Sequence, residues 1–345
     1  PRFRTPDMSW EAPNRHVHGS LLDVSYPDPQ STDPAGAHPL AVYLPPGYDS
    51  HRRIPYPTLY LSHGGGGNEV DWTTQGVANR IIDNLLARRM VQPMVIVMTN
   101  FNNLGSCSLF PGFDGSCYAT DLSNYVVPYV EAHYNVSHNP GDRAFAGLSL
   151  GGLLANYLLF HNTTLFGYFG TWSIGTIGAP LTTDPLWQNP ALKTRLGLEV
   201  GGGNFDSLTI PGINTYEAEL AAAGIPFSDA RLDAGHEWYT WRQLLYDYAT
   251  TVAFRHTTTI VQPASPWWHR DRHELIASVS GDTAEPEPPH GTVQFYVDGQ
   301  PLGRPRPIEH GRAVLPLFRG GHTVGAVYSG DNYYNGSTSP TVSVR

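Results

Sequence analysis

The pattern of hydrophobic and polar positions changes once along the chain, near residue 258. Before that point, short apolar runs alternate with stretches whose apolar residues recur at helical spacing, as in residues 122–134. The runs expected to be strands are 17–24, 40–44, 58–62, 94–99, 144–148, 168–172, 196–200 and 227–232, and the expected helices are 75–89, 121–134, 151–159, 215–223 and 238–253. Strands that alternate with helices indicate a mostly parallel sheet covered on both faces, so an α/β domain is expected over residues 1–257.

The remaining residues, 258–345, have an all-β pattern. Short alternating runs at 274–280, 292–297, 312–318 and 323–328 are separated by turn signals such as Asp298-Gly299 and Gly320-Gly321. A segment of this size and pattern fits a small Ig-like sandwich. It resembles the bacterial Ig-like repeats of secreted multidomain proteins, mainly through residues 291–299 (GTVQFYVDG) and 328–333 (YSGDNY). We expect this domain to serve as a spacer or to contact polymer or a cell surface.

Charge and composition exclude several classes of partner. The net charge is −9 and the basic residues are scattered, which argues against nucleic acid or an anionic membrane as a partner. No run approaches the roughly 18 consecutive apolar residues that a membrane helix needs. The chain has 15 histidines, but their spacing does not match a metal site that we would assign. We therefore expect no metal and no cofactor.

The two cysteines, Cys107 and Cys117, flank a short loop rich in glycine and proline. The alternatives are a disulfide and two free thiols. We favour the disulfide, because no other cysteine competes and the bridge would stabilise such a loop by roughly 2–3 kcal/mol. Disulfides persist in oxidising compartments, so the pair indicates a secreted protein.

The strongest chemical motif is GLSLGG at residues 147–152, which places Ser149 between an apolar strand and a helix. Small residues on both sides of a serine allow the strained strand-to-helix turn of a nucleophile elbow. The alternative is an ordinary tight turn with a helix-capping serine. Upstream, the glycine run HGGGGN at 63–68 follows another strand. Its bare N–H groups, together with that of Leu150, could stabilise an oxyanion. The alternatives are a phosphate loop, which lacks its Gly-Lys-Ser/Thr here, and a flexible linker.

A serine nucleophile needs a base, and His236 is the best-placed histidine, because it follows a strand and precedes the last helix of the domain. The alternative is a histidine with only a structural hydrogen bond at the start of that helix. The acid that orients the base should lie between the two in sequence. We choose Asp206, which follows the strand at 196–200, over its rivals Asp184 and Asp233.

At these residues the chain, from about 15 to 255, resembles the esterase family that includes feruloyl esterases, acetylxylan esterases and mycolyltransferases. The matching segments are HGGGG at 63–67 followed by Asp71-Trp72, GLSLGG at 147–152, and GHEW at 235–238 followed by Trp241. The resemblance implies an α/β-hydrolase fold. It also implies that Ser149, Asp206 and His236 form a catalytic triad. The N–H groups of Gly65 and Leu150 would form the oxyanion hole.

The expected function is carboxylic ester hydrolysis through an acyl-enzyme on Ser149, with a small ester or an esterified polysaccharide as substrate. Aromatic residues near the motifs are candidates for an aryl-accepting cleft: Trp72, Trp172 and Trp238 are assigned to the substrate, and Phe110 and Phe113 are further candidates. The alternative is that such aromatic side chains belong to the core. Two alternatives remain. One is acyl transfer of the mycolyltransferase type, and the other is a catalytically inactive binding protein with a hydrolase fold.

Overall fold

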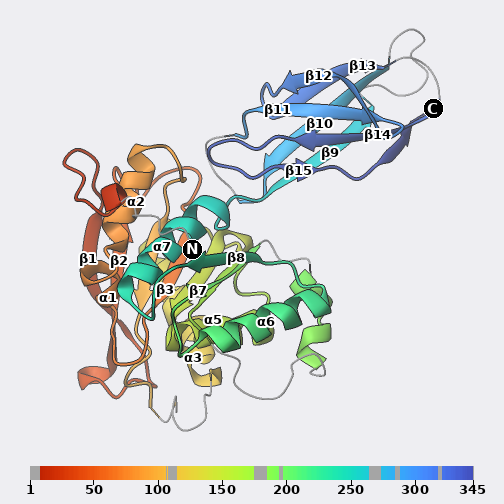
Figure 1. The fold of residues 1–345 in the computed structure, drawn as a ribbon. Helices are drawn as coiled ribbons and strands as arrows, with labels where there is room; N and C mark the ends of the chain where they lie inside the picture. Colours follow the sequence, from red (N-terminus) through yellow and green to blue (C-terminus); the bar gives the residue numbers. More distant parts are fainter. Residues whose placement is uncertain are drawn as a thin grey trace. The chain divides into compact units, whose positions relative to one another are not determined.

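The computed structural model describes residues 8–105, 107, 115–174, 185–193, 197–263, 273–283, 288–317 and 321–344. Its contacts divide the chain into two compact units, Pro1–Ala253 and Phe254–Arg345, each of which is described by itself (Figure 1). Three residues considered above, Phe110, Phe113 and Asp184, lie outside the described residues.

The first unit is built on an eight-stranded sheet in the order β1-β2-β4-β3-β5-β6-β7-β8. Its strands are β1 (Ser20–Pro27), β2 (Ala37–Leu44), β3 (Thr58–Ser62), β4 (Val95–Thr99), β5 (Arg143–Leu148), β6 (Tyr168–Trp172), β7 (Gly197–Gly203) and β8 (Ser228–Leu232). The pairs β1–β2 and β2–β4 are antiparallel and all others are parallel. The predicted mostly parallel sheet is therefore confirmed.

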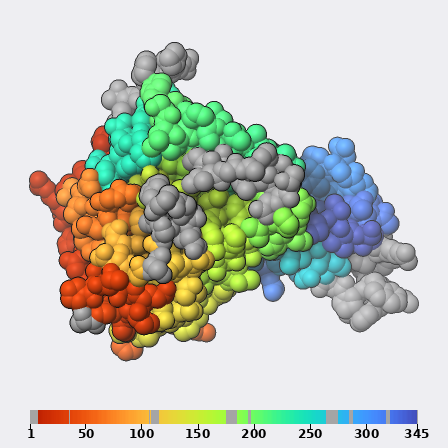
Figure 2. Space-filling model, turned by 90° about the horizontal axis from the view of Figure 1, so that it is seen from below, coloured from red at the N-terminus to blue at the C-terminus, as the bar shows by residue number. Residues whose placement is uncertain are grey.

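Helices cover both faces of this sheet (Figure 1). The helices are α1 (Asp71–Thr74), α2 (Ala78–Ala87), α3 (Ser116–Asp121), α4 (Val127–His133), α5 (Leu150–His161), α6 (Ile210–Ala223) and α7 (Trp238–Thr251). Helices α2 and α7 pack against each other on one face. Helices α3, α5 and α6 cover the other face and share one hydrophobic core with it. Figure 2 views the unit from that side, with the N-terminal residues in red and orange at one edge.

The burial of the strands follows from this covering. Strands β3 to β7 are buried at every residue, as expected of strands that have helices on both faces. Strand β1 lies at the edge of the sheet and is mostly exposed. The carboxyl ends of the parallel strands β3, β5, β6 and β7 meet at one edge of the sheet. In open α/β sheets that edge is where ligands bind.

Several helices differ from the prediction. The short helix α1 was not predicted, and the helix expected at 75–89 is α2, which begins only at Ala78. The helix expected at 121–134 begins at Ser116 and contains a π-helical turn, Leu122–Val126, followed by Pro128. The pattern missed its first turn because Tyr118 and Ala119 are its only buried apolar residues, too few to show a helical repeat. Helix α6 begins at Ile210 rather than at 215, with Pro211 in its first turn. Proline fits there because the first N–H groups of a helix have no intrahelical partner.

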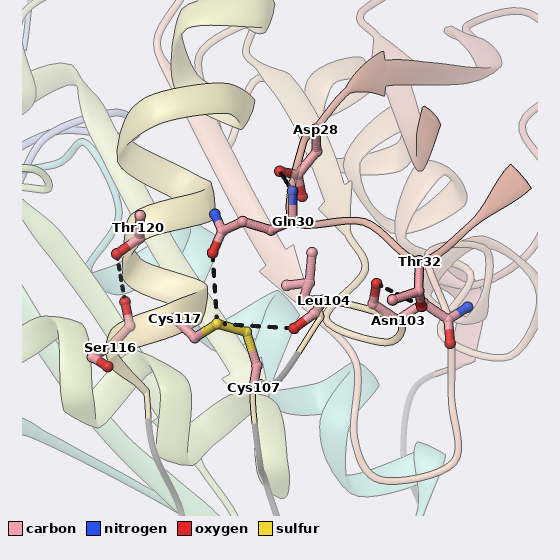
Figure 3. Close-up of a disulfide and its surroundings, with 9 residues drawn as sticks. All are labelled: Asp28, Gln30, Thr32, Asn103, Leu104, Cys107, Ser116, Cys117 and Thr120. Atoms are coloured by element: carbon pink, nitrogen blue, oxygen red, sulfur yellow. Dashed lines mark hydrogen bonds between the residues drawn. A yellow bond between two sulfur atoms is a disulfide. The ribbon is translucent and has the colours of Figure 1, made fainter. Parts of the chain in front are cut away.

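The predicted disulfide is present between Cys107 and Cys117, whose Cα atoms are 5.5 Å apart (Figure 3). It joins the segment that follows β4 to the first turn of α3. The sulfur of Cys117 lies 3.6 Å from the side-chain oxygen of Gln30 and 3.9 Å from the carbonyl oxygen of Leu104. The bridge therefore fixes the start of α3 against two loops of the first unit.

The second unit is a two-sheet sandwich, so the predicted Ig-like architecture is confirmed. One sheet has the order β13-β10-β9 and the other β12-β11-β14-β15, with β16 also paired to β14. The strands are β9 (Thr257–Pro263), β10 (His273–Gly281), β11 (Thr292–Val297), β12 (Gln300–Pro307), β13 (Arg312–Leu317), β14 (His322–Tyr328), β15 (Ser337–Thr338) and β16 (Val342–Val344). Leu275, Phe295 and Val324 lie in its core. Strand β12 was not predicted because it contains three prolines, which an edge strand tolerates.

Within these described ranges, no helix combines the length and the apolar character that crossing a membrane requires.

Candidate active site

Ser149 lies at a strained turn between β5 and α5. Its backbone φ is 53° and its N–H donates a hydrogen bond to the carbonyl of Trp172 at 2.9 Å. The neighbouring glycines are needed for space. A Cβ on Gly147 would lie 2.3 Å from the carbonyl oxygen of Gly151, and a Cβ on Gly151 would lie 2.4 Å from that of His63. The turn therefore has the geometry that the motif predicts for a nucleophile elbow.

The glycine run follows β3 and lies directly against this turn. A Cβ on Gly64 would be 3.3 Å from the Cβ of Ser149, and one on Gly65 would be 3.1 Å from Cδ1 of Leu150. Leu150 is the first residue of α5, and the first N–H groups of a helix have no partner within it. The structure thus brings the two predicted oxyanion donors, Gly65 and Leu150, side by side.

Three hydrogen bonds hold the glycine run in place. The side-chain amide of Asn102 donates to the carbonyl of Gly67 at 2.8 Å. The N–H of Gly67 donates to the carbonyl of Gly64 at 3.2 Å. The carboxylate of Asp71 accepts from the N–H of Asn68 at 3.3 Å. Donors that are fixed before the reaction stabilise a developing charge without a cost of reorganisation.

The predicted base and acid contact each other across two loops of the sheet edge. His236 precedes α7, Asp206 follows β7, and Nδ1 of His236 lies 2.7 Å from Oδ2 of Asp206. The side chain of Asp206 is fully buried, whereas that of His236 is 25% exposed. The buried carboxylate therefore orients an imidazole whose other side is open.

The carboxylate of Asp206 accepts further hydrogen bonds. The hydroxyl of Thr209 donates to Oδ2 at 2.5 Å, and the N–H groups of Leu208 and Thr209 donate to Oδ1 at 3.2 Å each. Burial alone would raise the pKa of Asp206. The hydrogen bonds from Thr209 and His236, and the attraction to His236, outweigh that effect and lower the pKa below its usual value. Asp206 is therefore ionised throughout the range in which an imidazole titrates.

The rival acid Asp233 has a different environment. It is exposed, and its carboxylate accepts a hydrogen bond from the side-chain amide of Asn204 at 2.8 Å. The other rival, Asp184, is outside the described residues. Of the candidates whose structure is described, Asp206 is the one bonded to His236.

His63, the histidine of the glycine run, is fully buried and its ring is stacked on that of Phe101. Its Nδ1 lies 2.7 Å from the carbonyl oxygen of Gly64, and burial lowers the pKa of His63. This ring belongs to the core beneath the glycine run.

Ser149 and His236 line one open cavity of about 290 Å³. Its other walls are the glycine run, the polar side chains Asp71 and Gln75, and the apolar side chains Leu148, Trp238 and Trp241. Among the described residues, no group of three or more His, Cys, Asp or Glu side chains is arranged to hold a metal ion. The cavity thus combines a nucleophile, a base and a partly aromatic wall.

Of the three tryptophans assigned to the substrate, the structure places only Trp238 in this cavity. Trp72 and Trp172 are fully buried, and their indole N–H groups donate to the carbonyl of Ser62 at 3.0 Å and to the carboxyl of Glu199 at 2.9 Å. The prediction is corrected for these two, because a side chain in the core that has no exposed surface cannot contact a substrate.

Trp241 takes part in the cavity wall and was not assigned to the site from the sequence. It lies one turn after Trp238 on α7, and the two rings pack edge to face with their centroids 5.2 Å apart. The signal was its spacing, since residues three apart share one face of a helix.

Comparison with known families gives two matches. Residues 31–196 match the family model described as "Putative esterase", and residues 250–345 match the bacterial Ig-like domain, group 3. The chain is 31% identical over 244 residues to an endo-1,4-beta-xylanase/feruloyl esterase of Xylanibacter ruminicola, an alignment that covers 68% of this chain and 31% of that protein. It is 29% identical over 145 residues to endo-1,4-beta-xylanase Y of Acetivibrio thermocellus, covering 39% of this chain and 13% of that one. The chain therefore spans less than a third of either relative.

Solved structures share the fold of the first unit. A feruloyl esterase module from Clostridium thermocellum aligns with a TM-score of 0.60 and 22% identity, over 72% of this chain and 92% of that one. A ferulic acid esterase from Anaeromyces mucronatus aligns with a TM-score of 0.62 and 19% identity, over 72% of this chain and 96% of that one. The predicted α/β-hydrolase fold is confirmed.

Proposed function

We propose that the chain hydrolyses carboxylic esters with Ser149 as nucleophile, from the premise that residues 31–196 match an esterase family model and residues 250–345 match a bacterial Ig-like domain. The observations that carry the proposal are that Ser149 and His236 line one cavity and that His236 is hydrogen-bonded to the buried Asp206. A positioned nucleophile, base and orienting acid define acyl transfer to serine, whatever the order of these residues in the chain.

In the proposed mechanism, the Ser149 oxygen attacks the ester carbonyl while Nε2 of His236 accepts the serine proton. The N–H groups of Gly65 and Leu150 stabilise the oxyanion of the tetrahedral intermediate. His236 then donates its proton to the departing alcohol, which leaves an acyl-enzyme. Water attacks the acyl group, His236 accepts a proton from that water, and the acid is released as Ser149 regains its proton. Asp206 keeps the imidazole in the required tautomer at each step.

The substrate that we propose is a feruloyl or acetyl ester carried by a xylan-type polysaccharide. Two observations support this choice: relatives of the chain are named feruloyl esterase or xylanase, and the cavity has an aromatic wall, formed by Trp238 and Trp241. Aromatic walls favour flat aryl groups through packing. We also propose that the protein is secreted, which is consistent with its disulfide.

A panel of esters tests the proposed substrate class. We expect kcat/KM for methyl ferulate to equal or exceed that for p-nitrophenyl acetate once corrected for the better leaving group, and p-nitrophenyl octanoate to be the poorest substrate, because a flexible alkyl chain packs less well than a flat aryl group on the aromatic wall of Trp238 and Trp241. A clear preference for octanoate would contradict the feruloyl proposal and favour a lipid ester. Transfer of the acyl group to added sugar in place of water would favour the acyltransferase alternative.

For the Ig-like domain we propose a role outside the chemistry, as a spacer or as a contact to polymer or a cell surface. The unit Phe254–Arg345 has its own core, and the proposed catalytic residues all belong to Pro1–Ala253. Removal of the residues after Ala253 should leave kcat/KM for p-nitrophenyl acetate within about threefold, because separate domains fold on their own cores. Any larger loss should appear with insoluble feruloylated xylan. A folded truncation with no activity on the small ester would contradict this role.

A further inference from the structure

A second serine at the same sheet edge has an unusual backbone. Ser173 follows β6, the neighbour of β5, and its φ is 49°, close to the 53° of Ser149. Non-glycine residues with positive φ cost about 1 kcal/mol or more, so the surroundings must hold them in place. Here the N–H of Ser173 donates to the carbonyl of Gly201, on the next strand, at 2.7 Å. The hydrogen bond to the sheet thus holds Ser173 in its strained backbone conformation.

This backbone turns the hydroxyl of Ser173 toward α7. Its oxygen accepts a hydrogen bond from the indole N–H of Trp241 at 3.0 Å, and both residues are buried, with 1% and 6% exposure. A buried indole N–H needs a partner, because leaving it without one costs about 1–3 kcal/mol. The hydroxyl of Ser173 therefore fixes where the ring of Trp241 lies.

The ring of Trp241 in turn packs against the imidazole of His236. The two planes are perpendicular and their centroids are 5.0 Å apart. His236 lies on the loop before α7, where one side of its ring is open to the cavity. The hydrogen bond to Asp206 fixes Nδ1, but a ring held at one atom can still tilt. The contact with Trp241 limits that tilt.

The residue before Ser173 completes the connection. The carbonyl of Trp172 accepts a hydrogen bond from the N–H of Ser149. Two consecutive residues, Trp172 and Ser173, are therefore connected to the nucleophile and to the base. One bonds to the nucleophile turn and the other reaches the base through Trp241.

We propose that Ser173 is a positioning residue that, through its hydrogen bond to Trp241, holds the imidazole of His236 in line with Ser149. The proposal rests on the proposed function, in which His236 accepts the proton of Ser149. Proton transfer requires the two heavy atoms within hydrogen-bond reach, and a displacement of about 1 Å can cost about a hundredfold in rate.

Three variants test this role. Ser173→Ala removes the hydroxyl, Ser173→Gly removes it together with the backbone strain, and Trp241→Phe keeps an aromatic ring but removes the N–H. We expect each to lower kcat by about 10- to 100-fold, since a tilted base slows the chemical step. The two Ser173 variants should leave KM within about twofold, because Ser173 does not line the cavity, whereas Trp241→Phe also changes the cavity wall and is compared by kcat. Labelling of Ser149 by a fluorophosphonate should slow by a similar factor, because it also needs the base.

Thr171 provides the matched control. It lies two residues earlier on β6, is fully buried, and its hydroxyl donates to the carbonyl of Glu199 at 3.2 Å. Thr171→Val removes a buried hydroxyl from the same strand, with no path to His236. We expect kcat to stay within about twofold of wild type, even if the melting temperature falls.

The double variant Ser173→Ala/Trp241→Phe separates a shared hydrogen bond from two unrelated losses. We expect its kcat to be no lower than that of the poorer single variant, because both changes remove the same bond. Additive losses, a Ser173→Ala enzyme with wild-type kcat, or an equal loss in Thr171→Val would each overturn the proposal. These outcomes require an active wild-type enzyme, so they are distinct from a failure of the proposed function, in which wild type itself would not hydrolyse esters.

Discussion

Replacing Ser149 by alanine should reduce kcat for p-nitrophenyl acetate by about 10⁴-fold or more, which is the loss expected when a serine nucleophile is removed. The remaining rate would come from the oxyanion donors and substrate binding. The fold should persist, since Ser149 is only partly buried and alanine has the same Cβ at the same φ of 53°. Steady-state kinetics and circular dichroism of the purified variant give the two measurements.

Ser207 provides the control for this experiment. It is an exposed serine in the loop that carries Asp206, and Ser207→Ala should keep wild-type turnover and melting temperature. Labelling with a fluorophosphonate should be lost in Ser149→Ala and kept in Ser207→Ala. If Ser149→Ala retained more than about a tenth of wild-type kcat, another group would be the nucleophile.

The parts of the site that could be predicted from the sequence are those set by local backbone geometry. The turn at Ser149 depends on Gly147 and Gly151, whose absent side chains leave room for carbonyl oxygens. Such a requirement is visible as a short motif between a strand and a helix. The sheet could be predicted from the sequence equally well, because buried parallel strands appear as short apolar runs.

What could not be predicted is which aromatic side chains face the cavity. Trp72 and Trp172 lie close to the motifs in sequence, yet they fill the core, whereas Trp238 and Trp241 form the wall. Burial depends on how α1, β6 and α7 pack together, and that packing has no local signal. The link from Ser173 to Trp241 was missed for the same reason, since it joins residues on separate elements.

Sequence order limited the candidates for the acid to residues between Ser149 and His236. The support for Asp206 among them comes from the tertiary structure. Thirty positions separate Asp206 from His236, and the strand between β7 and α7, β8, brings their loops together. Sequence left Asp233 as a rival, although its position only three residues before His236 makes a hydrogen bond to the imidazole awkward. In the fold its carboxylate points to Asn204 on the exposed surface.

Asp206→Asn should lower kcat by about 10³- to 10⁴-fold, close to the effect of the same change in a known serine triad. The bonding at Asp206 explains the size of this loss. The N–H groups of Leu208 and Thr209 donate to Oδ1, so the oxygen of an asparagine should occupy that position. Its NH₂ group would then replace Oδ2 and face Nδ1 of His236. Because this group donates, it selects the tautomer that carries its proton on Nε2, and that nitrogen can no longer accept the proton of Ser149.

The matched control is Asp233→Asn, which changes the same group at the rival position. We expect its kcat to stay within about twofold of wild type, since its carboxylate is exposed and bonds only to Asn204 among the described contacts. Both variants should keep KM near the wild-type value, because neither side chain lines the cavity. Measuring kcat and KM of the two enzymes side by side decides the assignment. If Asp233→Asn lost most of its kcat while Asp206→Asn stayed within tenfold of wild type, Asp233 would be the acid. The proposed orientation of His236 by Asp206 would then be wrong as well.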